Sequence, residues 1–279
     1  MQDLTNWPLA DRVQITGVFT DIDDTLTTDG AITPDALAAL EGLKAAGIHV
    51  IAITGRPVGW SMPFAQSWPL KAIVAENGAV LLHLSHQTST EPMHLWPVAL
   101  SKSYLQNASA RRANLARLQH AAARVLREIP GTTLARDSPG RETDIAIDHS
   151  EFAQLSPDQI DAVLRLLHSE GLHATVSSIH INAWVGEHHK LTGAHWAVKA
   201  LLGRDLAQEM DQWVFVGDST NDQLMFEAFE HSVGVANVRR FEAQLSGLKR
   251  LPRYVTEGER GAGFAEVVRA LLSATNASE

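Results

Sequence analysis

Three carboxylates crowd a short stretch near the N-terminus, "DIDDT", where Asp21, Asp23 and Asp24 follow the apolar run "ITGVF". Carboxylates this close repel one another, and a hard divalent cation with oxygen ligands relieves that repulsion at little cost. A second acidic stretch, "GDSTND", contributes Asp218 and Asp222 after another apolar run. The two stretches together predict a magnesium site, because Mg2+ binds through one or two carboxylates and also coordinates phosphate oxygens.

A phosphate pocket is indicated by "TGR", in which Thr54, Gly55 and Arg56 follow the apolar run "IHVIAI". A threonine hydroxyl and free backbone N–H groups at a strand-to-helix turn can hold a phosphate. The stretch "ENG", with Asn77, ends a further apolar run. A cation site and a phosphate pocket together predict phosphoryl transfer.

Alternating strand and helix signals must position these residues. Apolar runs predict strands at 15–19, 48–54, 71–82, 212–218 and 231–237, and helical patterns lie between them at 33–47, 191–203 and 222–230. The first helix has Thr33 as its N-cap, Pro34 in its first turn and Gly47 as its stop. This order predicts an α/β fold with a Rossmann-like, doubly wound parallel sheet. Ligands bind beyond the carboxyl ends of such strands, so the polar stretches are expected to converge on one rim.

The pattern changes in the middle of the chain. A long helix at 103–129, a strand at 143–148, a helix at 156–171 and paired strands at 174–179 and 180–186 predict an antiparallel α+β insertion. We therefore expect an α/β core of residues 1–83 and 188–279, with an inserted domain of residues 84–187 that the resemblance described next makes a cap domain on a catalytic core.

The ordered set "DIDDT", "TGR", a lysine after the insertion (Lys190) and "GDSTND" resembles the four motifs of the haloacid dehalogenase superfamily of phosphatases, over nearly the whole chain. It is most similar to the branch with a large α/β cap between the second and third motifs, subfamily IIB. That branch includes Cof-type, sucrose-phosphatase-like and mannosyl-3-phosphoglycerate phosphatase-like enzymes. The resemblance implies a Mg2+-dependent phosphatase.

The resemblance also implies catalytic roles. Asp21 would attack phosphorus and become an aspartyl phosphate, and Asp23 would protonate the leaving oxygen and then activate water. The Asp23 carbonyl and the side chains of Asp21 and Asp218 would bind Mg2+. Asp222 would support the metal directly or through a neighbour, unless it only caps the following helix, and Asn221 would orient its neighbours.

The phosphoryl oxygens would be held by Thr54 and by the backbone amides of Gly55 and Asp24. Lys190 would offset the negative charge of the nucleophile and phosphate, because a carboxylate attacks a phosphate dianion only once their repulsion is cancelled. The alternative for Lys190 is an ordinary solvated lysine.

In the resembling branch, the cap closes over the core and contributes substrate specificity. The first candidates lie in "RETD", where a guanidinium and two carboxylates suit sugar hydroxyls or an anion: Arg141, Glu142 and Asp144. The alternative for these three is an exposed charged turn. The second candidates lie in "SSIHIN", where only one parity can face the cleft, and we favour the polar set Ser178, His180 and Asn182. Arg56 and Asn77 would complete the wall on the core side.

Related enzymes of the branch act on sucrose phosphate, trehalose phosphate and mannosyl-3-phosphoglycerate, so the expected substrate is a phosphate monoester of a sugar or glycosyl metabolite. Two alternatives stay open. A phosphomutase would share the same core residues. A non-catalytic sugar-phosphate-binding regulatory module would have no use for Asp23 as acid and base.

Composition narrows the partners. The 279 residues carry a net charge of -9, which argues against binding to nucleic acid or anionic membrane. The chain contains no cysteine, and neither a secretory signal nor a membrane-length apolar segment is evident, so a cytoplasmic location is expected. The expected partner is a small phosphorylated molecule, and the oligomeric state is left open.

Overall fold

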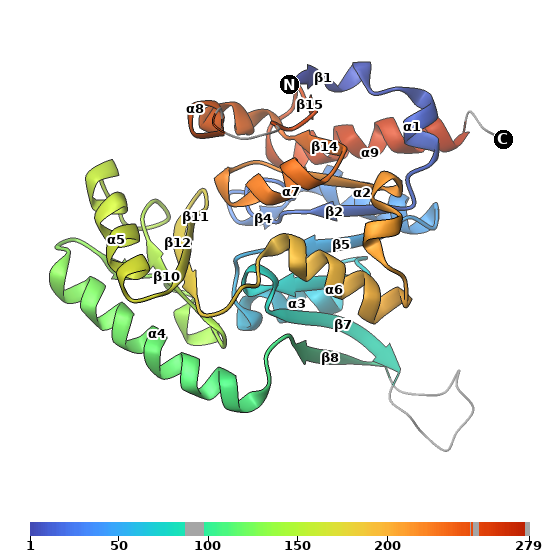
Figure 1. The fold of residues 1–279 in the computed structure, drawn as a ribbon. Coiled ribbons are helices and arrows are strands. Elements are labelled where there is room, and N and C mark those ends of the chain that lie inside the picture. The colour runs from blue at the N-terminus through green and yellow to red at the C-terminus, as the bar shows by residue number, and fades with distance from the viewer. Residues whose placement is uncertain (87–97, 246, 248–250, 277–279) are drawn as a thin grey trace.

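A nine-stranded sheet with the order β1-β15-β14-β13-β2-β5-β6-β7-β8 forms the centre of the molecule (Figure 1). The structure is a computed structural model, and it describes residues 1–86, 98–245, 247 and 251–276. Neighbouring strands from β1 to β6 are parallel, whereas β7 and β8 are antiparallel. The strands are β1 (Gln2–Asp3), β15 (Tyr254–Val255), β14 (His231–Gly234), β13 (Trp213–Gly217), β2 (Gly17–Thr20), β5 (His49–Ile53), β6 (Ala72–Ala75), β7 (Val80–His86) and β8 (Val98–Tyr104).

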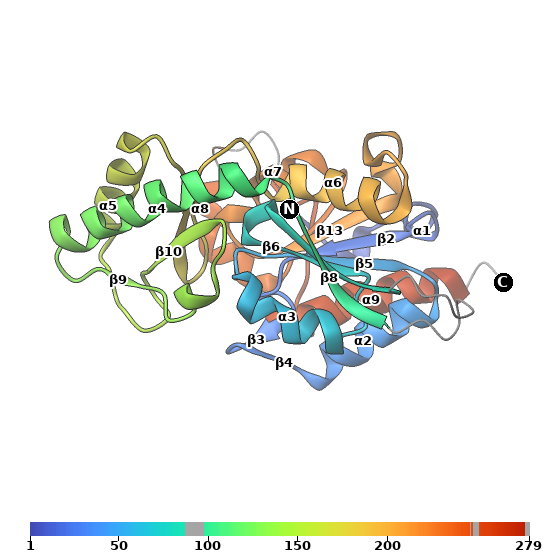
Figure 2. The same cartoon turned by 90° about the horizontal axis from the view of Figure 1, so that it is seen from below.

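Helices cover both faces of this sheet, as Figure 2 shows from below. One face carries α2 (Pro34–Ala45), α3 (Val58–Ser67) and α9 (Arg260–Asn276), with α1 (Leu9–Val13) beside α9, and the other carries α6 (Lys190–Leu202) and α7 (Gln223–Ala228). The short α8 (Glu242–Leu245) precedes β15 in the chain. Strand β13 contributes side chains to the apolar cores on both faces of the sheet. Val214 and Val216 pack toward α2 and α9, while Trp213 and Phe215 pack toward α6 and α7. The predicted doubly wound α/β core is confirmed.

A separate antiparallel sheet, with the order β11-β12-β10-β9, lies at one end of the core sheet (Figure 1). It consists of β9 (Thr133–Leu134), β10 (Asp144–Asp148), β11 (His173–Val176) and β12 (His180–Trp184), and it packs against α4 (Ala108–Glu128) and α5 (Pro157–Ser169). Ile181 and Ala183 of β12 face these helices. By alternation, His180 and Asn182 of the favoured polar set face the core. The one-parity expectation fails in the turn before β12, where Ser177 and Ile179 line the same cavity as Ser178. A two-stranded hairpin, β3 (Thr27–Thr28) and β4 (Ala31–Ile32), follows the first acidic stretch.

The core sheet extends further along the chain than the expected division at residue 84. Strand β8 pairs with β7 from Val80↔Tyr104 to His86↔Val98, and β7 in turn pairs with β6. Leu100 and Tyr104 pack against the core cluster, so apolar burial holds this hairpin on the core. The separate layer therefore begins with α4, after Tyr104.

Within the described residues, no helix has the length and apolar character needed to cross a bilayer.

Candidate active site

Three buried carboxylates meet where β2 and β13 end. Ligand oxygens of Asp21, Asp218 and Asp222 all lie within 4.8 Å of one another. The backbone N–H of Asp21 donates to the Val216 carbonyl at 2.9 Å, which extends the pairing of the two strands to the first carboxylate. Asp21 and Asp218 are 197 positions apart in the sequence. The neighbouring parallel strands therefore bring two distant acidic stretches together.

Lys190 lies between two of these carboxylates. Its Nζ is 2.9 Å from Asp21 Oδ1 and 2.7 Å from Asp222 Oδ1, and its side chain is only 3% exposed. Lys190 is the first residue of α6, and a capping box between His189 and Thr192 fixes that first turn. Lys190 is therefore not an ordinary solvated lysine, because its ammonium is buried and pairs with two carboxylates.

The electrostatics of this cluster favour a cation. Burial raises the pKa of Asp21 to about 7; Lys190 opposes the shift, and Asp222 and Asp23 add to it. Burial also raises the pKa of Asp218 well above its usual range, and Asp222 and Asp21 add to the effect. Burial alone would lower the pKa of Lys190, but Asp21 and Asp222 outweigh it and the pKa is raised. One lysine thus faces three buried carboxylates, and hard oxygen ligands with uncompensated charge fit Mg2+.

Asp222 acts as an anchor within the cluster. Its Oδ1 accepts from Lys190 Nζ, and its Oδ2 accepts the backbone N–H groups of Asp218 at 3.0 Å and Ser219 at 3.3 Å. It occupies the N-cap position of α7, yet its carboxylate makes no capping bond to that helix. Asn221 accepts from the Ser219 hydroxyl at 2.8 Å. The carboxylate therefore ties Lys190 to the Asp218 loop.

Asn237, which the sequence reasoning missed, holds two parts of the site together. Its Nδ2 donates to Asp218 Oδ2 at 3.1 Å and to the Asp24 carbonyl at 3.0 Å, and its Oδ1 accepts from the Arg260 backbone N–H at 3.0 Å. It lies just past β14, the strand next to β13. The rule that polar residues follow parallel strands could have found it, because Asn237 ends the predicted strand at 231–237.

The "TGR" turn follows β5 beside the first acidic stretch. Thr54 is fully buried, and its Oγ1 accepts the backbone N–H of Arg56 at 3.0 Å. The Gly55 position is crowded, since an added Cβ would lie 3.2 Å from Asn77 Oδ1 and 3.3 Å from Asn182 Oδ1. Glycine at this position therefore lets the core turn and the second layer approach closely.

Asp23 and Asp24 point to different partners. Asp23 faces the guanidinium of Arg56, whose Nε lies 3.0 Å from each carboxylate oxygen. Asp24 has a left-handed backbone with φ 55°, and its carboxylate lies 3.1 Å from Arg260 Nε. Burial raises the pKa of Asp24; Arg260 and a hydrogen bond from Ser178 oppose the shift. The hairpin between β11 and β12 thus reaches the first acidic stretch through Ser178.

Several predicted cap residues contact the core turns. The Asn77 amide donates to Asp144 Oδ2 at 3.3 Å, and Asn182 Nδ2 donates to the Gly55 carbonyl at 3.1 Å. Arg141 donates through Nη1 to the same carbonyl at 3.0 Å and to Asp144 Oδ1 at 2.8 Å. Burial raises the pKa of Asp144 to about 7, against the effect of Arg141. The exposed-turn alternative does not describe Arg141 or Asp144, since both are buried between the layers.

The structure does not bring the Glu142 carboxylate to this cleft. It accepts from Lys102 Nζ at 2.7 Å and from the Tyr104 hydroxyl, both on β8. The backbone N–H of Glu142 donates to the Glu76 carboxylate, while the Glu142 side chain extends toward β8. Arg141 and Asp144 therefore contact the core turn at Gly55 and Asn77, whereas the Glu142 carboxylate contacts β8.

Glu76 joins the two layers from the core side, and the sequence reasoning assigned it no role. Its buried carboxylate accepts the backbone N–H groups of Val58 at 3.0 Å, Glu142 at 2.9 Å and Thr143 at 2.6 Å. Glu76 and Asn77 both have left-handed backbones, with φ 50° and 56°. Such strain costs free energy and persists where surrounding contacts hold it, as these hydrogen bonds do.

The reaction chamber is nearly closed. A cavity of only about 10 Å³ lies between the core and the second layer, lined by Asp21, Asp23, Gly55, Arg56, Ser177, Ser178, Ile179, His180, Asn182 and Asn221. A cavity of about 320 Å³ adjoins it on the Asp23 side, with Arg56, Glu151, Phe152 and Arg260 in its wall. The two layers thus leave little open volume beside Asp21.

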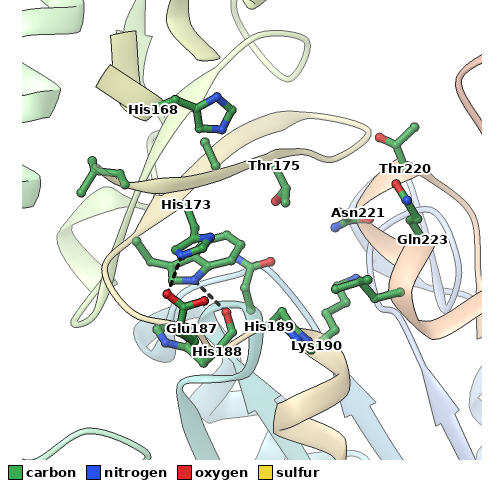
Figure 3. A pocket seen from close by; sticks show the side chains of 15 residues that line it. His168, His173, Thr175, Glu187, His188, His189, Lys190, Thr220, Asn221 and Gln223 are labelled. Atoms are coloured by element: carbon green, nitrogen blue, oxygen red, sulfur yellow. Dashed lines mark hydrogen bonds and ion pairs between the residues drawn. The ribbon is translucent and has the colours of Figure 1, made fainter. Parts of the chain in front are cut away.

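A larger cavity of about 560 Å³ opens on the Lys190 side, between β11, β12 and the start of α7 (Figure 3). Figure 3 shows His173 and Glu187 in contact on one wall of the cavity, with Thr220, Asn221 and Gln223 on the opposite wall. Among the described residues that line it, Asp21 and Asp23 do not occur. This cavity therefore borders Lys190 but not Asp23.

Comparison with known proteins finds similar hydrolases and phosphatases. Residues 18–118 match the family model of haloacid dehalogenase-like hydrolases. A phosphoglycolate phosphatase of Methanothermobacter thermautotrophicus is 25% identical over 260 residues, covering 91% of this chain and 98% of its own. A chain of Streptococcus pyogenes serotype M6 named as a phosphatase is 25% identical over 282 residues, covering 90% and 96%.

Solved structures share the fold. A Thermoplasma acidophilum protein superposes with a TM-score of 0.66 at 15% identity, covering 92% of this chain and 98% of its own. The sucrose-phosphatase of Synechocystis, in complex with sucrose and phosphate, superposes with a TM-score of 0.64 at 15% identity and the same coverage.

The fold and the carboxylate cluster thus define a hydrolase with an α/β core. Residues 18–118 match the haloacid dehalogenase-like hydrolases and both curated relatives are named phosphatases, which supports an enzyme of the phosphatase class.

Proposed function

We propose that this enzyme is a Mg2+-dependent phosphatase that hydrolyses a phosphate monoester of a sugar or glycosyl metabolite through an aspartyl phosphate on Asp21. One observation carries the proposal: Lys190 Nζ contacts Asp21 and Asp222 in a buried cluster with Asp218. An anionic nucleophile beside a lysine and a divalent-cation site is what attack on a phosphate dianion requires.

The chemistry has two steps. In the first, a carboxylate oxygen of Asp21 forms a bond to phosphorus while the bond from phosphorus to the leaving oxygen breaks, and Asp23 gives its proton to that oxygen. In the second, Asp23 takes a proton from water as the water oxygen attacks phosphorus, the bond to Asp21 breaks, and inorganic phosphate forms.

Phosphate oxygens would be held by Thr54 and by the backbone amides of Gly55 and Asp24, with Lys190 offsetting their charge. Asp21, Asp218 and the Asp23 carbonyl would hold Mg2+, and Asp222 would fix Lys190 and the Asp218 loop around it. The metal would supply Lewis-acid neutralisation of charge on the nucleophile and the phosphoryl group.

Room for the leaving group lies on the Asp23 side. The leaving oxygen must come within hydrogen-bond reach of Asp23, and that carboxylate lines the cavity of about 320 Å³. This volume falls at the lower end of the range of about 300–1,000 Å³ that is typical of small-molecule sites. It suits a sugar better than a two-carbon acid, although one relative is named a phosphoglycolate phosphatase. The sucrose bound to the similar sucrose-phosphatase supports the sugar assignment.

We also propose that the layer of β9 to β12 with α4 and α5 serves as the cap. Its polar face supplies Ser178, His180 and Asn182 to the closed chamber. Its movement would admit substrate, and its return would exclude water that competes with the substrate hydroxyls.

A phosphatase panel tests this proposal. Wild type, Asp21→Asn and the control Asp158→Asn, an exposed carboxylate on α5, would be assayed with Mg2+ on hexose phosphates, phosphoglycolate, phosphoglycerates and nucleotides. We expect hydrolysis by wild type and the control, highest on a hexose phosphate, and none by Asp21→Asn.

Three outcomes would contradict parts of the proposal. Equal release of phosphate by Asp21→Asn would contradict the role of Asp21. A clear preference for phosphoglycolate would contradict the sugar assignment but not the phosphatase. Interconversion of labelled hexose phosphates without inorganic phosphate, followed by NMR, would show a phosphomutase instead.

A further inference from the structure

We propose that Arg56, together with two carboxylates of the second layer, Asp137 and Glu151, positions Asp23 for proton transfer. Docking of the second layer would then complete the acid/base group as well as close the chamber. The inference rests on the proposed function, and it gives Arg56 a role different from the substrate contact expected from the sequence.

The core side of this arrangement is a fork of hydrogen bonds. Arg56 Nε lies 3.0 Å from both oxygens of Asp23, and its Nη2 lies 2.9 Å from Oδ1. A guanidinium that meets a carboxylate through two nitrogens fixes both the position and the plane of the carboxyl group. A lysine could neutralise Asp23 but could not hold it in one orientation.

The other side reaches into the second layer. Arg56 Nη1 lies 3.1 Å from Asp137 Oδ2, and Nη2 lies 3.0 Å from Glu151 Oε1. Each of these carboxylates has a second partner in its own layer: Asp137 pairs with Arg141 at 3.2 Å, and Glu151 Oε2 lies 2.8 Å from His180 Nε2. The positions of both carboxylates are therefore set by the second layer and not by Arg56 alone.

The stem of Arg56 is fixed by the core. Its backbone N–H donates to Thr54 Oγ1, and its guanidinium lies over the Trp60 ring at 5.0 Å. Burial alone would lower the pKa of Arg56, but Asp23, Glu151 and Asp137 outweigh it and raise the pKa. The group is a permanent cation with a side chain only 7% exposed.

All three guanidinium nitrogens donate to carboxylates, so Arg56 is already engaged before any substrate binds. If the second layer moves away to admit substrate, Arg56 loses Asp137 and Glu151 and keeps Asp23. With the layer docked, the cation is held from both sides, and Asp23 is fixed beside the chamber and the cavity of about 320 Å³. Arg56, Asp137 and Glu151 are thus positioning residues that act through Asp23.

The test compares leaving groups. A hexose phosphate has a poor alkoxide leaving group that needs a proton, whereas p-nitrophenyl phosphate releases a stable phenolate that needs little acid assistance. The variants are Arg56→Gln, Arg56→Lys, Glu151→Gln and Asp137→Asn. The control is Arg124→Gln, which removes an arginine on α4 whose salt-bridge partners are Glu128 and Glu170 rather than Asp23, Asp137 or Glu151.

We expect Arg56→Gln to lower the ratio of kcat on hexose phosphate to kcat on p-nitrophenyl phosphate by about tenfold or more, since a positioned acid contributes about 10²–10⁴-fold. Glu151→Gln and Asp137→Asn should lower the same ratio several-fold, although neither residue contacts Asp23. Arg56→Lys should lower it too, because one ammonium cannot hold both carboxylate oxygens in plane. Arg124→Gln should leave it unchanged.

Loss of folding would lower both rates together, and circular dichroism would show it, so the ratio separates positioning from stability. An unchanged ratio in the Arg56 variants, or a raised KM with unchanged kcat, would overturn the inference and assign Arg56 to substrate binding or structure. If wild type hydrolysed neither substrate, the proposed function would be wrong and the inference would fall with it. An active wild type with an unchanged ratio refutes the inference alone.

Discussion

Replacement of Lys190 by methionine is the perturbation whose size the structure bounds best. Methionine keeps most of the length of the apolar stem but removes the ammonium that lies 2.9 Å from Asp21 and 2.7 Å from Asp222. Two unit charges at 2.9 Å attract by about 6 kcal/mol at an effective dielectric constant of about 20. Desolvation of the lysine offsets part of this, and loss of one partner from a buried ion pair costs about 3–5 kcal/mol in measured cases.

The rate should fall by a comparable amount. In the transition state, negative charge develops between Asp21 and the phosphoryl group, and Lys190 is paired directly with Asp21. If the loss of about 3–5 kcal/mol is carried into the barrier, kcat at saturating Mg2+ falls by about 10²–10⁴-fold, while KM changes little.

The assay is steady-state release of inorganic phosphate by Lys190→Met, Lys190→Arg and the control Lys199→Met. Lys199 is exposed on the same helix, α6, and its Nζ donates to the Gly203 carbonyl at 3.4 Å. The control should keep wild-type kcat, and Lys190→Arg should lie between the two. A folded Lys190→Met variant with kcat within about tenfold of wild type would refute the reasoning, because such a loss is only about 1.4 kcal/mol.

Three further substitutions test separate parts of the site. Burial raises the pKa of Asp144 from 3.8 to about 7, so the folded chain keeps a proton there that the unfolded chain has lost. The free energy of unfolding should therefore fall as pH rises between about 4 and 7, by up to about 4 kcal/mol from this group, and Asp144→Asn should flatten the fall in urea titrations. Asn237→Ala removes the donor 3.1 Å from Asp218 Oδ2 and should raise the Mg2+ concentration for half-maximal rate by about tenfold or more, measured by metal titration. Phe152→Ala should raise KM for a hexose phosphate several-fold, whereas Leu224→Ala, which truncates an exposed apolar side chain at the larger cavity, should leave KM unchanged in the same kinetics. A pH slope that stays as steep, an unaltered metal requirement, or equal KM effects of the two truncations would each count against the corresponding assignment.

Much of the core geometry could be predicted from the sequence because parallel strands end at one edge. Strands β13, β2, β5 and β6 are consecutive neighbours in the sheet. The residues that follow them, Asp218, Asp21, Thr54 and Asn77, therefore share that edge whatever their separation along the chain. Periodicity likewise gave the correct parity of β12, since Ile181 and Ala183 had to face the helices.

The partners of these residues could not be predicted, because they depend on how the second layer sits on the core. The sequence pattern places Arg56 at the rim but says nothing of Asp137 and Glu151, which lie about 80 and 95 positions later and reach it only through the packed layers. Glu76 is similar, because its ligands are backbone amides of Glu142 and Thr143 that no side-chain pattern reveals.

Local backbone direction decided the remaining differences. Glu142 was expected beside Arg141 and Asp144, yet its amide turns toward Glu76 and its carboxylate toward Lys102. The expected boundary between the core and the inserted domain was wrong for a related reason. Strand β8 joins the core sheet through its pairing with β7. The weak alternation of residues 98–104 could not show to which of the two layers this strand belongs.

The most direct test of the central claim is to trap the aspartyl phosphate. In Asp23→Asn, attack by Asp21 on p-nitrophenyl phosphate needs no acid, but hydrolysis of the intermediate has lost its base. We predict that intact-mass spectrometry of this variant shows the addition of one phosphoryl group in the presence of Mg2+. Borohydride reduction should then convert Asp21, and not Asp218 or Asp222, to homoserine. A phosphoryl group on any other residue, or steady turnover with no covalent species in either wild type or Asp23→Asn, would contradict the account.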